Sequence, residues 1–185
     1  PAGYGAIEYA YSLMARAAGI DMAACRLLEE NGRRRADLCL RLEILAGVDS
    51  PPELTEERLR SLDPRIVFFL HWSHKVPDSI VETFECINFH MTDVPCGRGG
   101  SPLQNLISRG HRETKLTALK MSSRFDAGPV YLKRPLSLEG GTAEEIFLRA
   151  SFLAAEMIRE IVSRELAPAP QQGEPTIFER RTPAQ

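Results

Sequence analysis

An amide and an imidazole stand two residues apart at the end of a short apolar run, CINFH, which covers Cys86 to His90. If this run is a β-strand, Asn88 and His90 project from the same face, with Cα atoms about 6.7 Å apart. An amide can donate to a developing negative charge, and an imidazole can also move a proton. The spacing therefore predicts one polar patch built from both side chains.

A loop rich in glycine and proline, MTDVPCGRGGSP, follows that run directly. Glycines let the backbone approach a ligand closely, and Arg98 can pair with an acidic group.

Two continuous apolar runs, residues 65–70 and 86–90, have the composition of strands buried on both faces. Pro77 marks the start of a short helix between them, which predicts a βαβ unit. Thr142 is an expected N-cap for a long amphipathic helix that reaches about residue 165. The other expected elements are helices from residue 55, at 102–109 and at 6–17, a helix-compatible segment at 33–46, strands at 115–121 and 129–136, a strand or helix at 20–28, and a short run at 176–178.

These elements predict an α/β fold with a mostly parallel central sheet flanked by helices. Residues 1–166 are expected to form one catalytic domain, whose first strand precedes the turn GYG, and residues 167–185 a C-terminal tail or linker.

The bulk composition favours a small-molecule partner. The chain has 185 residues, 43% of them hydrophobic, and a formal charge of −2, which marks no nucleic-acid or membrane surface. Its four cysteines contain no CxxC pair, and we expect buried thiols in a cytoplasmic protein. His71 and His74 have the His-x-x-His spacing, but no further ligand follows, so no metal is expected. The basic run at 33–35 is either a solvated helix start or a phosphate contact.

Several segments, in order, resemble the folate-dependent formyltransferase family. They are DPRIVFFL and CINFH, then GRGGSPLQNLI at 97–107, DAGPVYLKRPL at 126–136 and the closing TIFERRTP. The Arg-Gly segment is similar to that of the methionyl-tRNA branch. The resemblance covers most of the chain from about residue 60, and it implies a Rossmann-like formyltransferase fold.

The resemblance also implies the roles of individual residues. The catalytic residues would be Asn88, His90 and Asp126. Asp126, which stands 36 residues after His90 in the sequence DAG, would orient the imidazole from a turn at the carboxyl-terminal edge of the sheet. The formyl donor would be 10-formyltetrahydrofolate, and the acceptor an amine. The glycine-rich loop would lie beside the acceptor, through Arg98, Gly99 and Gly100. The folate pocket would be lined by Trp72, Ser73, His74, Lys75, Val76, Phe125 and Gly128.

The choice of acceptor comes from departures from the family pattern. Residues 92–95 read TDVP where the family has Ser-Leu-Leu-Pro, and Leu119 replaces a second histidine of the purine-biosynthesis enzymes. No RNA-binding domain follows Gln185, so the expected acceptor is the amine of an amino-sugar nucleotide, with no nucleic-acid or membrane partner. A homodimer is left open.

Other interpretations stay open beside this one. Asn88 and His90 could simply cap a strand, as an isolated pair often does. The chain could formylate an amino-acid-type acceptor within a larger biosynthetic system, hydrolyse formyl-folate, or only bind a folate or sugar nucleotide.

Overall fold

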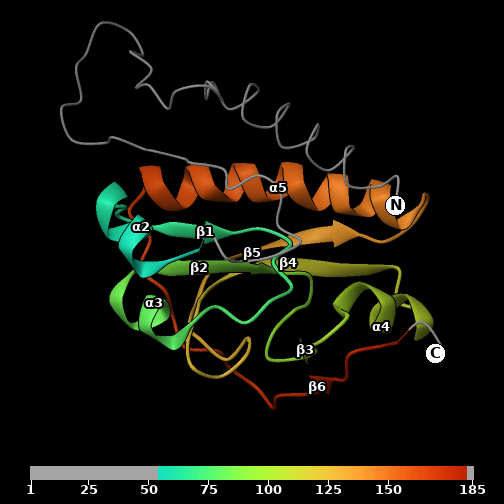
Figure 1. The fold of residues 1–185 in the computed structure, drawn as a ribbon. Coiled ribbons are helices and arrows are strands. Elements are labelled where there is room, and N and C mark those ends of the chain that lie inside the picture. The colour runs from blue at the N-terminus through green and yellow to red at the C-terminus, as the bar shows by residue number, and fades with distance from the viewer. Residues whose placement is uncertain (1–53, 183–185) are drawn as a thin grey trace, which may run out of the picture.

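The computed structural model describes residues 54–182 of the chain. Four strands of this part form the central sheet, in the order β1-β2-β4-β5 (Figure 1). β1 (Val67–Phe69) pairs in parallel with β2 (Cys86–His90), and α3 (Asp78–Thr83) lies between them in sequence. The predicted βαβ unit is therefore confirmed. The turn at residues 3–5, the elements expected between 6 and 46, and the basic run at 33–35 lie outside the described residues.

The described sheet is mixed rather than mostly parallel. β4 (Glu113–Lys120) runs antiparallel to β2, and β5 (Val130–Ser137) runs antiparallel to β4. Residues 121–129 lead from β4 straight into its neighbour, so this connection needs no crossover helix. The α/β, Rossmann-like class is confirmed, whereas the expected strand direction is wrong for the β4 and β5 pairings.

The two faces of β2 are buried by different helices. Ile87 and Phe89 belong to a core that includes residues of α5 (Ala143–Ser163), while Cys86 packs with Ile80 of α3. Figure 1 shows α5 along one side of the sheet and α3 on the other. Because side chains alternate along a strand, Asn88 and His90 share the face of Cys86.

α5 begins as the sequence predicts. The Thr142 hydroxyl accepts from the Glu145 backbone N–H, and the Glu145 carboxylate accepts from the Thr142 N–H in return. This reciprocal pair satisfies two backbone donors that the first helical turn leaves without partners. The two shorter helices are α2 (Glu56–Leu62), capped by Thr55, and α4 (Pro102–Ser108).

The segment after α5 lies against the rest of the described chain. Ala169 forms a β-bridge with Val130, and β6 (Ile177–Phe178) pairs in parallel with β3 (Arg98–Gly99). The domain boundary at residue 166 stays a prediction, but residues 167–182 contact both the β4–β5 connection and the glycine-rich loop.

Two expectations about side chains and membranes can be compared with the described part of the chain. Cys86 is buried as expected, but Cys96 is exposed because it lies in the loop before β3, so that prediction is wrong for Cys96. Between residues 54 and 182, no helix is both long and apolar enough to cross a membrane.

Candidate active site

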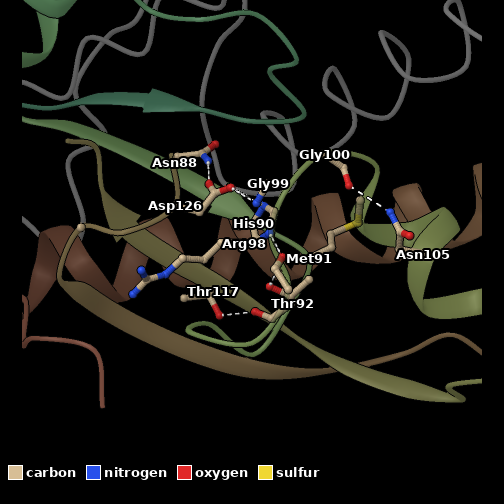
Figure 2. Close-up of polar contacts among 12 residues, drawn as sticks. Asn88, His90, Met91, Thr92, Arg98, Gly99, Gly100, Asn105, Thr117 and Asp126 are labelled. Atoms are coloured by element: carbon tan, nitrogen blue, oxygen red, sulfur yellow. Dashed lines mark hydrogen bonds and ion pairs between the residues drawn. The ribbon is translucent and has the colours of Figure 1, made fainter. Parts of the chain in front are cut away.

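Asn88, His90 and Asp126 come together at one point beside β2 (Figure 2). The Asn88 Nδ2 donates to Asp126 Oδ1 at 3.2 Å, and Asp126 Oδ2 lies 3.6 Å from His90 Nδ1. The same Oδ2 accepts from the Gly99 backbone N–H at 2.9 Å. His90 and Asp126 expose only 7% and 9% of their side chains, so solvent would screen the carboxylate little from a positive charge on the ring.

The backbone carbonyl of Gly97 sets the orientation of the imidazole. His90 Nε2 lies 2.8 Å from this oxygen, and the Thr92 hydroxyl donates to it at 3.2 Å. A carbonyl oxygen can only accept, so His90 Nε2 carries a hydrogen. Proton exchange by the ring is therefore confined to Nδ1, the nitrogen that faces Asp126.

The connection that carries Asp126 begins at the end of the sheet opposite to the expected carboxyl-terminal edge. β4 is antiparallel to β2 with Lys120 opposite Ile87, so residues 121–129 leave beside the amino-terminal end of β2. The Met121 N–H bonds to the Cys86 carbonyl there at 2.8 Å. The connection then doubles back along β2 to bring Asp126 to Asn88, which corrects the expectation that the turn lies at the carboxyl-terminal edge.

Asp126 holds an unusual backbone conformation within that connection. Its φ of 51° lies in the left-handed region, which aspartate adopts more readily than most residues. Gly128 follows, and a Cβ there would come 1.8 Å from the Lys120 carbonyl oxygen. Glycine at 128 therefore permits contact with backbone, and its predicted role in folate binding stays a prediction.

The glycine-rich loop is packed against the C-terminal segment. A Cβ at Gly99 would come 2.6 Å from the Phe178 carbonyl oxygen, and one at Gly100 would come 2.7 Å from Arg180 Cα. Glycine at these two positions thus allows the loop to lie close to β6 and to Arg180. The sequence alone does not reveal this need for glycine. Gly99 also donates its N–H to Asp126, so the predicted acceptor loop directly touches the predicted catalytic carboxylate.

Ion pairs fix the loop TDVP, in which the sequence departs from the pattern of the family that it resembles. Asp93 pairs with Lys115 at 2.8 Å and with Lys133 at 2.6 Å, and Lys133 also donates to the Val94 carbonyl. Burial alone would raise the pKa of Asp93, but its hydrogen bonds and charge pairing with both lysines outweigh burial and lower this pKa. Thr92 and Val94 are fully buried, so these residues hold the loop rather than face a ligand.

Only some of the predicted folate-binding residues from Trp72 to Val76 are exposed at the surface. Val76 is buried beside Phe69, whereas Lys75 is exposed and pairs with Asp78. Trp72 packs edge-on against Phe69, with ring centroids 5.4 Å apart, and its Nε1 is buried with no hydrogen-bond partner.

The remaining predicted folate residues are placed as follows. The His74 ring lies 6.0 Å from that of Trp72, the Ser73 carbonyl accepts from Arg180, and Phe125, next to Asp126, is 67% exposed. A separate cavity of about 380 Å³ lies near the amino-terminal ends of β1 and β2, away from the site, and contains none of these residues; it is lined by Arg60, Asp63, Pro64, Arg65, Thr83, Phe84 and Glu85.

Sequence reasoning missed Gln171. Its side chain donates to the carbonyls of Asp126 and Gly128 and accepts from Arg98. The sequence around it, PAPQQGEP, has neither a periodic pattern nor an ionisable side chain beside the glutamine, so nothing in it indicates a site. Among residues 54–182, no group of three or more His, Cys, Asp or Glu side chains is placed to hold a metal ion.

Comparison with known proteins points to one family. The chain is 33% identical over 120 residues to a methionyl-tRNA formyltransferase of Methylococcus capsulatus, in a match that covers 63% of this chain and 38% of that protein. A solved methionyl-tRNA formyltransferase from Clostridium thermocellum matches with a TM-score of 0.71 and 48% identity, over 73% of this chain and 60% of that one. No family model matches the chain.

A third match shows the fold alone. The formyltransferase PseJ from Anoxybacillus kamchatkensis, solved with a formamido sugar nucleotide and tetrahydrofolate, has a TM-score of 0.53 and 17% identity, over 63% of this chain and 65% of that one. The described fold and these matches support the expected relationship to the folate-dependent formyltransferase family. It spans well under two thirds of the Methylococcus relative, and 60% of the Clostridium protein.

Proposed function

We propose that the chain transfers a formyl group from 10-formyltetrahydrofolate to a primary amine, with Asn88, His90 and Asp126 as its catalytic residues. The observation that carries this proposal is the convergence of the three side chains, from a strand and a loop 36 residues further on, at one buried point. Similarity to the formyltransferase family supports the same reaction.

In this reaction the amine nitrogen attacks the formyl carbon, which gives a tetrahedral intermediate with a negatively charged oxygen. One hydrogen of Asn88 Nδ2 bonds to Asp126, and the second is free to point at that oxygen. A donor of this kind typically contributes about 3 kcal/mol to the transition state. Asp126 thereby fixes the direction of the Asn88 amide.

His90 handles the proton that the reaction displaces. Because Nε2 keeps its hydrogen on Gly97, Nδ1 is the atom that takes the proton from the attacking amine and returns it to N10 of the leaving tetrahydrofolate. The neighbouring Asp126 carboxylate stabilises the positive ring between these two steps. The carbon–N10 bond breaks as the proton arrives, so atoms and charge balance.

For the donor, we propose that the folate lies between the Trp72–Val76 segment and the Asp126 loop. The exposed ring of Phe125 supports this placement, since it offers a stacking surface. The loop from Arg98 to Gly100 contacts the Asp126 carboxylate through Gly99, and we propose that it binds the acceptor.

For the acceptor, the relatives change the expectation. The proteins that are 33% and 48% identical are methionyl-tRNA formyltransferases, whereas the sugar-nucleotide enzyme PseJ is similar in fold alone. We therefore favour the aminoacyl amine of methionyl-tRNA over an amino-sugar nucleotide, and we no longer expect an absence of nucleic-acid partners. The amino-sugar nucleotide stays as the alternative to be tested.

The test is an absorbance assay for tetrahydrofolate formed from 10-formyltetrahydrofolate. Parallel reactions contain methionyl-tRNA, a panel of amino-sugar nucleotides, free amino acids, or no amine. Turnover only with methionyl-tRNA supports the proposal, and turnover only with a sugar nucleotide overturns the acceptor. Product without any amine identifies a hydrolase, and folate binding without turnover in any reaction identifies a binding module.

A further inference from the structure

The amide of Gln171 uses all its hydrogen-bonding positions on the two sides of the candidate site. Its Nε2 donates to the Asp126 carbonyl at 2.8 Å and to the Gly128 carbonyl at 2.7 Å. Its Oε1 accepts from Arg98 Nε at 3.1 Å and from Arg98 Nη2 at 2.7 Å. Two donors and two lone pairs are the full capacity of a primary amide, so the contacts fix which end is oxygen.

The two hydrogen bonds from Gln171 Nε2 go to the connection between β4 and β5, whose conformation depends on contacts with the rest of the chain. Asp126 has a left-handed φ of 51°, and such residues persist when surrounding contacts over-determine them. Within the connection, the Ala127 N–H bonds only weakly to the Arg124 carbonyl, at 3.4 Å. Gln171 supplies two shorter bonds from a segment 45 residues further along the chain.

The Oε1 contacts lead back to the same carboxylate. Arg98 is joined through the chain to Gly99, whose N–H donates to Asp126 Oδ2. Asp126 is thus held at its carbonyl by Gln171 and at its carboxylate by Gly99, while Gln171 also binds Arg98. The contacts form a closed ring, and a shift of any member moves the carboxylate that faces His90 Nδ1.

We propose that Gln171 is a positioning residue, which sets the Asp126 carboxylate against Asn88 and His90 by anchoring the backbone on either side of it. The proposal rests on the proposed function, because positioning matters for turnover only if Asp126 takes part in it. Gln171 itself touches no reacting atom and acts through Asp126.

The sharpest substitution is Gln171→Glu. It keeps the length of the side chain and strengthens the contact with Arg98, but it replaces the donor Nε2 by an oxygen that faces two carbonyls. We expect kcat to fall at least about 10-fold, since displacement of a catalytic group by about 1 Å can lower rates 10²-fold, with the KM for the formyl donor changed less than about threefold. Gln172→Glu is the matched control, because Gln172 is exposed and the substitution makes the same change of charge.

Two readouts separate positioning from a loss of fold. Hydrogen–deuterium exchange of the Gly99 amide should be faster in Gln171→Glu than in Gln172→Glu, while their melting temperatures stay similar. In an Asp126→Asn background, Gln171→Glu should lower kcat by less than about twofold, because its effect passes through the lost carboxylate.

The outcomes distinguish this inference from the proposed function. If the wild-type chain forms tetrahydrofolate and Gln171→Glu matches Gln172→Glu in both kcat and Gly99 exchange, the positioning role is overturned. If the wild-type chain has no activity but Gly99 exchange still responds to Gln171→Glu, the contacts position Asp126 and the proposed reaction fails. Equal losses of kcat in the wild-type and Asp126→Asn backgrounds would also refute action through Asp126.

Discussion

Asp126→Asn removes one negative charge from the candidate site and leaves a side chain of nearly the same shape. The asparagine oxygen can still accept from the Gly99 N–H, and the Asn88 amide can rotate to accept from the new amide nitrogen. The substitution therefore leaves the local hydrogen bonds satisfiable. It removes the negative charge that stabilises a positive His90 ring during proton transfer, and it re-aims the amide of Asn88.

The size of this effect follows from the geometry. Asp126 Oδ2 lies 3.6 Å from His90 Nδ1, and both side chains are almost fully buried. Two unit charges about 4 Å apart interact by about 4 kcal/mol at an effective dielectric constant of about 20. Such an energy corresponds to a rate factor of roughly 10³, so we expect kcat to fall by about 10²-fold to 10³-fold.

The assay measures tetrahydrofolate formation under saturating donor and acceptor, with circular dichroism to compare folding. The KM for the donor should change little, because the lost charge faces the imidazole rather than the proposed folate pocket. A folded Asp126→Asn variant that keeps kcat within about threefold of the wild type would refute the assignment of Asp126, and with it the argument from charge stabilisation.

Two other substitutions test stability. Gly128→Ala should lower the free energy of unfolding by about 1–3 kcal/mol or more, because its Cβ would meet the Lys120 carbonyl oxygen at 1.8 Å; an unchanged urea midpoint would contradict that contact. Burial lowers the pKa of His71 to about 4 from 6.5, so the unfolded chain binds more protons between these values. Stability should be highest above about pH 6.5 and fall, by as much as roughly 3 kcal/mol, as the pH is lowered to about 4. His71→Gln should flatten this dependence in urea melts, and an equal slope in both proteins would argue against a buried neutral His71.

Local pattern was enough to predict the strand that carries Asn88 and His90. The run Cys86–His90 has the apolar composition of a strand buried on both faces, and β2 has those bounds. The cap at Thr142 was equally accessible, because N-cap chemistry depends on residues three positions apart. The start of the helix after Thr55 was predicted as well.

Long-range geometry was not accessible in the same way. The antiparallel direction of β4 depends on which strand it pairs with, and this decides from which end of β2 Asp126 arrives. Gln171 binds backbone carbonyl groups, which every residue has, so the spacing of side chains in the sequence does not indicate its partners. The close contacts of Gly99 and Gly100 with the C-terminal segment are hidden for the same reason.

The candidate site is assembled from parts of unequal stiffness. Asn88 and His90 belong to a central strand of the sheet, whereas Asp126 is carried on a connection between strands. Connections tolerate changes of sequence and length far better than central strands do. Residues 122–124 could therefore be varied in a library, with Phe125, Asp126 and Gly128 held constant, to retune the placement of the carboxylate without rebuilding the core. In protein engineering, this connection is the natural adjustable element of the candidate site.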